Sequence, residues 1–247
     1  MTRLSQRGLL SGISVALLSI TAAEVSPHVL LFAQEEAHGI REFTDSTTWR
    51  VPVGVTHIIV ELWGAGGGGA AGTSAVVGGS PTAGGGGGGG GSGSYVRASL
   101  SVTPGESLTI RVGAAGAGGR ADATRPQGGL AGADTLLLRE GVPLLVAKGG
   151  LGGAAPPRRG DTRGGAEGAG GPAEPHPARL VRSGSAGARG HDGGLPESYS
   201  TSGGPGGVAV LGTVQPPGSF GGAGGAGRDS MPANGKPGGA GSVLITW

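Results

Sequence analysis

The fold is decided by the stretch Thr48-Trp49-Arg50-Val51-Pro52-Val53-Gly54-Val55-Thr56-His57-Ile58-Ile59-Val60-Glu61-Leu62-Trp63-Gly64-Ala65-Gly66-Gly67-Gly68-Gly69. It predicts a short strand, a Pro/Gly turn, a second strand and then a glycine tract. Successive residues of a strand face opposite sides. The second strand therefore turns one set of side chains to each side of a sheet: Ile58, Val60 and Leu62 against His57, Ile59, Glu61 and Trp63.

The composition points to an all-β protein with an unusual amount of glycine. Of 247 residues, 60 are Gly and 17 are Pro, and only 3% are aromatic; average usage is about 7% Gly and 5% Pro. The apolar residues gather in β-like runs between glycine tracts, which favours an ordered domain over a disordered one. No segment has a helical period of useful length.

Charge and cysteine content exclude some classes of partner and stabilisation. The formal net charge of +2 predicts no nucleic-acid partner, and no polyanionic partner follows from it. Because the chain has no Cys, a domain outside the cell has to rely on its core and its backbone hydrogen bonds.

The N-terminus has the pattern of a secretory signal. Arg3 and Arg7 precede the apolar run Gly8–Ala23, which predicts a signal peptide over residues 1–23 and a secreted or cell-surface protein. Cleavage fits after Ala23 or after Ala33. The alternatives are a membrane anchor, for which the run is shorter than the roughly 20 residues a span needs, and a start codon further downstream. Residues 24–41 are predicted to be a linker, and residues 42–247 the domain.

Further strands follow along the chain. Arg41–Thr44 and Trp49–Val51 are expected around a turn at Asp45-Ser46. Three more elements are predicted: a hairpin of Tyr95–Thr103 and Leu108–Val112 through Pro104-Gly105-Glu106, a second hairpin of Thr135–Arg139 and Val142–Ala147 with Pro143 on an edge, and a final strand, Ser242–Trp247. Together they predict a small β-sandwich built from Phe43–Trp63, Tyr95–Val112, Thr135–Ala147 and Val243–Trp247.

The glycine tracts are expected to be ordered rather than flexible. Ordering glycine is entropically costly, so an ordered tract needs compensating contacts. Left-handed extended helices with three residues per turn supply them by packing side by side, because backbones without Cβ atoms approach closely. Collagen is excluded, since Gly84 to Gly91 and the irregular glycine spacing break its strict period.

Two motifs resemble the glycine-rich domain family: Trp49 to Thr56 followed by Val60 to Gly69, and the closing run Gly238 to Trp247. The likeness continues through Ser94-Tyr95-Val96, Val102 to Glu106 and Ile110 to Gly113, and covers about residues 42 to 247. That family is similar to phage tail-fibre and adhesin-tip proteins, bacterial secreted proteins and the glycine-rich region of anaplastic lymphoma kinase. The resemblance implies a β-sandwich framing a bundle of polyglycine II helices, with binding or structural roles and no catalytic residues. Ala154 to Ser202 departs from it, being richer in Pro, Arg and acids.

Three short motifs match known site patterns, and the high glycine content of the chain makes such matches common by chance. Gly64 to Gly69 satisfies G-x-G-x-x-G, but no helix or acidic residue follows as a dinucleotide site requires. Gly224 to Pro232 fits one nonapeptide calcium repeat, with a partial echo at Gly187 to Asp192, yet no adjacent repeat follows. Arg159-Gly160-Asp161 is an integrin-type tripeptide, and three-residue matches are common by chance.

No catalytic, cofactor or metal site is predicted. None of the five His residues has a His or Cys partner at ligand spacing, and no G-x-S-x-G elbow is present. His57 is expected to be a solvated residue on a strand face. Trp49, Trp63 and Trp247 are expected to pack the sandwich, with sugar stacking as the second interpretation.

The hypothesis is a secreted, non-enzymatic structural or adhesive protein, a rigid scaffold whose loops, chiefly Pro156 to Ser202, meet a cell-surface glycan or protein. A calcium-binding repeat protein and a small secreted hydrolase are the alternatives. A membrane is expected to be contacted only through an uncleaved N-terminal segment. The residues predicted to contact a partner are Arg158, Arg159, Asp161, Arg163, Arg179, Arg182 and Tyr199.

Overall fold

A computed structural model describes residues 38–122, 125–158, 160–174, 179–194, 200–212, 220–228 and 231–247. They belong to one compact unit, Glu35–Trp247. The predicted signal peptide and most of the predicted linker lie outside the described residues. Within the described residues every regular element is a strand, so the all-β prediction is confirmed.

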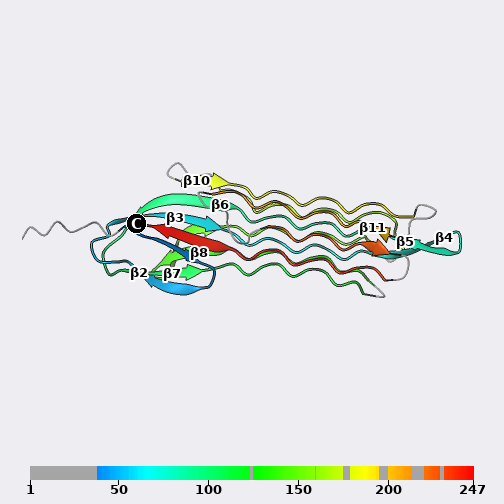
Figure 1. Ribbon diagram of the computed structural model, residues 1–247, viewed down its shortest axis with the longest axis horizontal. Helices are drawn as coiled ribbons and strands as arrows, with labels where there is room; N and C mark the ends of the chain where they lie inside the picture. Colours follow the sequence, from blue (N-terminus) through cyan, green and yellow to red (C-terminus); the bar gives the residue numbers. More distant parts are fainter. Residues whose placement is uncertain are drawn as a thin grey trace, which may run out of the picture. The chain divides into compact units, whose positions relative to one another are not determined.

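Two antiparallel sheets form the sandwich (Figure 1). The five-stranded sheet contains, in spatial order, β1 (Ile40–Phe43), β13 (Ser242–Thr246), β3 (His57–Trp63), β6 (Tyr95–Ser101) and β10 (Arg179–Arg182). The four-stranded sheet contains β2 (Thr47–Arg50), β7 (Ser107–Arg111), β8 (Thr135–Arg139) and β9 (Val142–Ala147). β1 pairs with the last strand, so the two ends of the described chain meet in one sheet.

The core lies between these sheets and follows the alternation of the strands. Ile58, Val60 and Leu62 of β3 are buried there, as their spacing predicts, while His57 on the other face is exposed. The four-stranded sheet contributes Leu108, Ile110, Leu137 and Leu145. Trp49 is buried in the same core and packs against Trp247, with ring centroids 5.5 Å apart and ring planes tilted by 44°. The prediction that these two tryptophans pack the sandwich is therefore confirmed.

One predicted hairpin is wrong and the other is confirmed. β6 and β7 belong to different sheets: β6 pairs with β3 and β10, and β7 with β2 and β8. The tight turn at Gly105 (φ +82°) therefore carries the chain from one layer to the other, which alternation alone cannot reveal. β8 and β9 do form a hairpin through Glu140 and Gly141, and Pro143 lies on the edge strand, as predicted.

Glycine-rich segments run back and forth from the sandwich as extended chains (Figure 1). Outgoing segments alternate with returning ones. Their ranges, within the described residues, are 64–73, 84–94, 113–122, 125–134, 148–158, 160–172, 183–194, 202–212, 220–228 and 231–241. We call this array the bundle, and the end of it remote from the sandwich the distal end.

Segment 64–73 shows the threefold order of the bundle. Its successive backbone N–H groups donate in rotation to three different neighbours. Gly67 donates to Gly91, Gly68 to Leu130 and Gly69 to Lys236, each at 2.9 Å, and Ala70 returns to the first neighbour at Gly88. A helix with three residues per turn presents its donors in this way. The predicted polyglycine II packing is thus the observed one.

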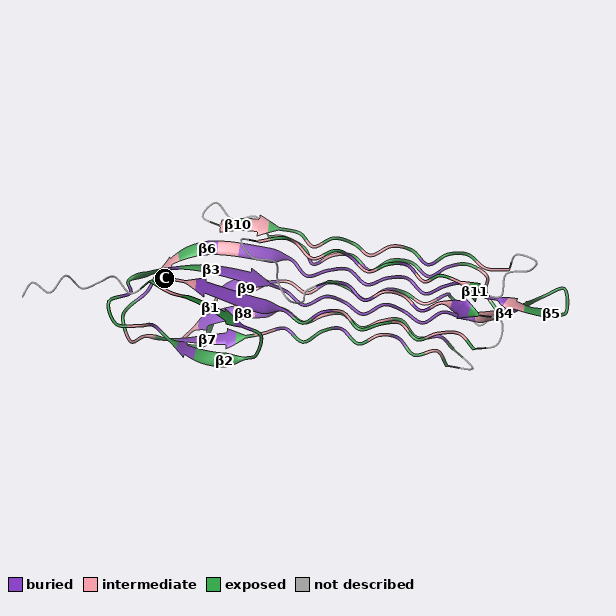
Figure 2. Ribbon diagram, viewed as in Figure 1, coloured by how far each residue is buried: buried purple, intermediate pink, exposed green. Residues whose placement is uncertain are grey.

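Segments 64–73 and 84–94 form the centre of the bundle. The first donates to segments 84–94, 125–134 and 231–241, and accepts from 113–122, 148–158 and 220–228. The second has hydrogen bonds to six segments as well: 64–73, 148–158, 160–172, 183–194, 202–212 and 220–228. Figure 2 shows the interior segments buried and the outer ones alternating between buried and exposed residues.

Many positions in the centre require glycine, although Ala70, Ala71 and Ser92 are fully buried there too. A Cβ on Gly68, Gly88 or Gly90 would collide with the backbone carbonyl of a neighbouring segment. Positive φ is a separate matter: among the described glycines it occurs at turns and segment ends, such as Gly54, Gly105 and Gly141. The bundle glycines therefore serve close approach rather than an unusual backbone conformation.

Two short sheets close the distal end, and neither was predicted. β4 (Ser74–Val77) and β5 (Ser80–Ala83) form a hairpin, while β11 (Ser200–Thr201) pairs with β12 (Gly227–Arg228). The region from Gly64 to Gly93 was expected to be one glycine tract. The signal for the hairpin was present, since Val76-Val77 and Ser80 flank Gly78-Gly79, a turn dipeptide with both φ positive.

Candidate binding surface at the distal end

The chain ends and the chain reversals of the bundle lie at opposite ends of the described unit. Gly39 and Trp247 exchange two backbone hydrogen bonds, of 2.8 and 2.9 Å, at the sandwich. The β4–β5 hairpin lies at the distal end (Figure 1). From Gly64 to Thr73 the extended chain rises about 3.1 Å per residue, which sets the distal end roughly 30 Å from the sandwich.

The distal end is made of turns that the bundle brings together from distant parts of the sequence. Beside the β4–β5 hairpin lie the described residues of the reversals near 120–127, 156–163, 191–201 and 228–233. Gly160 donates to Ser74 at 2.9 Å, and Gly194 donates to Ala83 at 2.9 Å. These bonds tie two reversals to the base of the hairpin.

Apart from a few small buried residues such as Ala65, Ala70 and Ser92, side chains lie on the outside of the bundle and at its turns. In segment 113–122, Gly113, Gly116 and Gly119 are buried at intervals of three, while Ala114 and Ala117 between them are exposed. The exposed hydrophobic residues of the hairpin are Val76 and Val77. The distal end is thus the place where the bundle presents varied side chains on an ordered base.

The structure divides the predicted contact residues between the two ends. Arg158, Asp161 and Arg163 are at the distal end, where Gly85 donates to Asp161 at 3.0 Å. Arg179 and Arg182 are in β10, where Arg182 is opposite Tyr95. From residue 85 to residue 95 the chain rises roughly 30 Å at about 3.1 Å per residue. They therefore do not form one site, and Arg159 and Tyr199 lie outside the described residues.

The stretch predicted to be the main loop region is largely part of the bundle. Gly165, Gly168 and Gly171 donate to segment 84–94. Ala188 and His191 accept from segment 84–94 and donate to segment 202–212. Residues 156–202 are therefore not one continuous loop in the described chain. Their glycines at intervals of three face inward, which explains why this region tolerates so many Pro, Arg and acidic residues between them.

Within the tripeptide motif, Gly160 and Asp161 lie in a distal turn. Gly160 has φ +83°, and the Asp161 N–H donates to Arg158 at 3.1 Å. The Asp161 carboxylate accepts the Arg163 N–H at 2.9 Å. The carboxylate thus holds the turn, an ordinary structural use of Asp.

A second feature, a buried polar cluster, lies where the sandwich meets the bundle. Glu61 is 3% exposed and accepts the Tyr95 hydroxyl at 2.7 Å, while Arg97 lies 3.9 Å from its other oxygen. Trp63 donates its indole N–H to Val210 at 2.9 Å. Burial, followed by the Glu61 hydrogen bond, raises the pKa of Tyr95 well above its usual range.

The sequence missed this cluster because the residues that form it, on β3, β6 and segment 202–212, are far apart along the chain. Segment 202–212 covers the cluster, and a Cβ on Gly212 would collide with Trp63 and Glu61. Trp63 is therefore buried outside the main core, together with Tyr95 and Leu244. Its faces are covered, which leaves no room for the sugar stacking weighed from the sequence.

A concavity of about 520 Å³ lies on the sandwich, lined by Ser101, Val102, Thr103, Glu106, Ser107, Arg139 and Glu140. Arg139 pairs with Glu106 and also donates to Ser101 at 2.8 Å. Glu106 accepts the Thr103 N–H at 2.8 Å. These groups satisfy one another and connect the β6–β7 crossover to β8, so their arrangement is structural.

The remaining motifs lie inside the bundle. Gly64 to Gly69, which matched a dinucleotide fingerprint, is the start of a central segment, and the described residues of the calcium-type repeat, Gly224–Arg228, belong to an outer one. Among the described residues, no three His, Cys, Asp or Glu side chains gather as a metal site would require. Nor does that part of the chain contain a helix that would span a bilayer.

A β-sandwich carrying a hydrogen-bonded bundle of glycine helices defines the class of this protein. The family model described as a glycine-rich domain matches residues 42–247, and the chain belongs to that family. No curated protein matches the chain. The resemblance drawn from the opening and closing motifs is confirmed.

Proposed function

We propose that this is a secreted, non-enzymatic protein with a structural or adhesive role, in which the bundle presents the distal turns to a cell-surface glycan or protein. The observation that carries the proposal is the arrangement of the described domain. Gly39 and Trp247 are paired at the sandwich, whereas the hairpin and the other distal turns lie at the opposite end of the bundle. Attachment through the sandwich would leave the distal turns facing outward.

Order in the bundle supports a role as a spacer. Backbone hydrogen bonds in three directions connect each central segment to six others, so bending the bundle would break many of them together. A presented surface on an ordered base loses less entropy on binding than a flexible loop does. The apolar hairpin residues Val76 and Val77 and the neighbouring polar turns give this surface its chemical variety.

Secretion is tested by expressing the full chain and determining where the mature protein begins. We expect export with a new N-terminus after Ala23 or Ala33. A variant with Leu17 and Leu18 replaced by Arg should remain inside the cell, because the apolar run is what a secretory signal needs. Retention of the unaltered chain with an intact N-terminus would contradict the proposal.

Binding is tested with the labelled mature domain on intact cells and on a glycan array. The test variant carries Val76→Ser, Val77→Ser and Pro81→Ser in the hairpin, and the control variant carries Val53→Ser, an exposed residue of the sandwich. We expect the hairpin variant to lose binding and the control to keep it. Equal binding by both variants, with slow amide exchange proving that both are folded, would place the binding surface elsewhere.

A further inference from the structure

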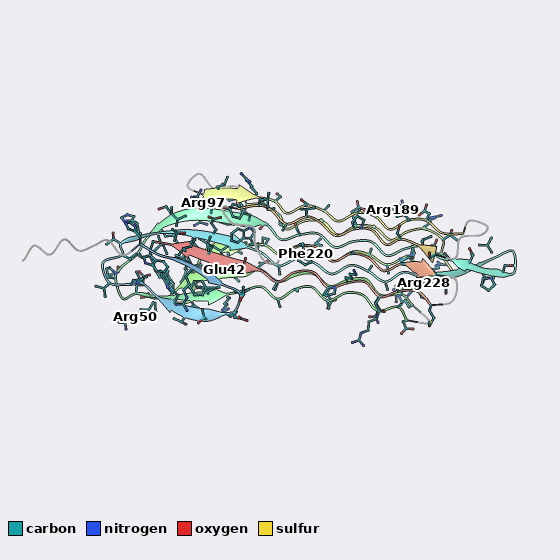
Figure 3. The ribbon with its side chains drawn as sticks, in the orientation of Figure 1. Glu42, Arg50, Arg97, Arg189, Phe220 and Arg228 are labelled. Carbon is teal, nitrogen blue, oxygen red and sulfur yellow. The ribbon has the colours of Figure 1, made fainter. Side chains whose placement is uncertain are left out.

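Exposed arginines gather in the distal turns and the segments that adjoin them. They are Arg120, Arg125, Arg158, Arg163, Arg189 and Arg228. Figure 3 labels Arg189 and Arg228 near the β4–β5 hairpin. The described acids of the same turns and segments are Asp122, Asp161, Glu167 and Asp192, so six described arginines accompany four described acids.

Two of the distal acids, Asp161 and Asp192, hold the backbone with their carboxylates. Asp161 accepts the Arg163 N–H, and Asp192 accepts the Gly164 N–H at 2.7 Å. Arg189 forms an ion pair with Asp192, at 3.1 Å.

Most of these arginines lie along one continuous side of the bundle. Segment 125–134 donates to both 113–122 and 148–158, segment 148–158 donates to 160–172, and segment 183–194 donates to 160–172. The turns that carry Arg120, Arg125, Arg158 and Arg163, and the segment with Arg189, are therefore successive neighbours. We call these five arginines the arginine rim.

We propose that the arginine rim binds polyanionic polysaccharide, a chain that repeats carboxylate, sulfate or phosphate groups. The inference rests on the proposed function, since it names the chemistry of the partner at the distal end. Guanidinium groups bind such oxyanions in a bidentate manner. Weak single contacts add up when several are held on one ordered base, and a repeating anion contacts them together.

The test measures binding of the mature domain to immobilised alginate, dextran sulfate and polyphosphate, with neutral dextran as the reference. The rim variant replaces Arg120, Arg125, Arg158 and Arg163 by Ser. A control variant of equal charge replaces Arg41, Arg50, Arg111 and Arg179, all outside the distal end, by Ser. We expect the rim variant to bind on the order of 1,000-fold more weakly, because each of the four arginines contributes about 1 kcal/mol near an anionic surface and about 1.4 kcal/mol corresponds to tenfold. The control should change less than about threefold, and binding should weaken with salt.

Two results would overturn the inference: equal loss in both variants, which means general ion exchange, or no binding to any of the three polyanions. The three ligands carry carboxylate, sulfate and phosphate groups, respectively. If the arginine rim prefers one of these groups, binding to that ligand alone should persist at high salt. Cell binding by the rim variant separates this inference from the proposed function. If that variant still binds cells while the hairpin variant does not, the distal surface functions without the arginine rim.

Discussion

The sandwich and the bundle solve the problem of close packing in opposite ways. In the sandwich, large side chains such as Leu62, Leu108 and Ile110 fill the space between two sheets. In the bundle, the absence of side chains lets backbones approach until their amides and carbonyls pair in three directions. The first region loses stability when a side chain shrinks, and the second when one grows. Enlarging a side chain is therefore expected to destabilise the bundle, and truncating one is expected to destabilise the sandwich.

The largest effect is expected from adding one methyl group at the centre of the bundle. Gly88→Ala would push its Cβ into the carbonyl of Ala166, and the neighbouring segments hold that carbonyl in place. We expect a loss of more than about 3 kcal/mol in the free energy of unfolding, measured by denaturant titration. Fast amide exchange in segments 64–73 and 84–94 should accompany it.

Gly128→Ala is the matched control for this substitution. Gly128 is an exposed bundle glycine without positive φ, and the nearest atom to its Cβ would be the Gly153 oxygen at 3.1 Å. A change within about 0.5 kcal/mol is expected, as for an ordinary surface position. Similar losses in both variants would show that glycine matters for its conformational freedom rather than for space.

The effect of truncating a core side chain in the sandwich is tested by Leu108→Ala. Leu108 is fully buried between the sheets, so its truncation leaves a cavity and should cost about 3 kcal/mol. The amides of segment 84–94 should stay protected if the bundle retains its own order once formed. Parallel loss of protection in both regions would show instead that they unfold as one unit.

A smaller effect is expected where the two regions meet. Tyr95→Phe removes the hydroxyl that donates to the buried Glu61 carboxylate, and should cost about 2 kcal/mol near neutral pH. Because the pKa of Tyr95 is raised in the folded state, the wild type keeps its full stability below the ordinary tyrosine pKa of about 10 and loses it as the pH rises further. Unfolding measured between pH 9 and pH 11 should therefore show a shallower decline for Tyr95→Phe. An identical decline in both proteins would contradict the role of Tyr95.

The smallest effect is expected at the distal tip. Replacing residues 75–82 by Gly-Gly keeps Ser74 and Ala83, which accept the hydrogen bonds from Gly160 and Gly194. Because the exposed hairpin side chains add little to the core, the melting temperature should change by less than about 3 °C. A large decrease would mean that the hairpin stabilises the bundle and does not merely extend from it.

Prediction from the sequence succeeded where the signal was local. The alternation from Ile58 to Leu62 identified a half-buried strand, and Glu140-Gly141 identified a hairpin turn. The glycine tracts indicated packed helices because no other ordered structure would use so many residues without side chains. The β4–β5 hairpin had a local signal too, Gly78-Gly79, which the surrounding glycine concealed.

Prediction failed where the answer depended on residues distant in sequence. Glu61 and Trp63 lie on the face of β3 opposite Ile58, Val60 and Leu62, and segment 202–212, far along the chain, buries them. Arg163 and Arg182 have the same local character, yet they lie near opposite ends of the bundle. The contact residues were grouped by composition, and composition carries no information about such separation.

The sequence by itself determined the class of the protein, because strand periodicity and glycine content are properties of neighbouring residues along one chain. Only the tertiary structure decided which segments lie at the centre, which layer each strand joins and which turns meet at the distal end. Each central segment has hydrogen bonds to six other segments. Each outer segment turns the face that carries its glycines toward the interior of the bundle. The position of each segment in the bundle depends on close approach between backbones that are distant in sequence. No single segment encodes that approach by itself.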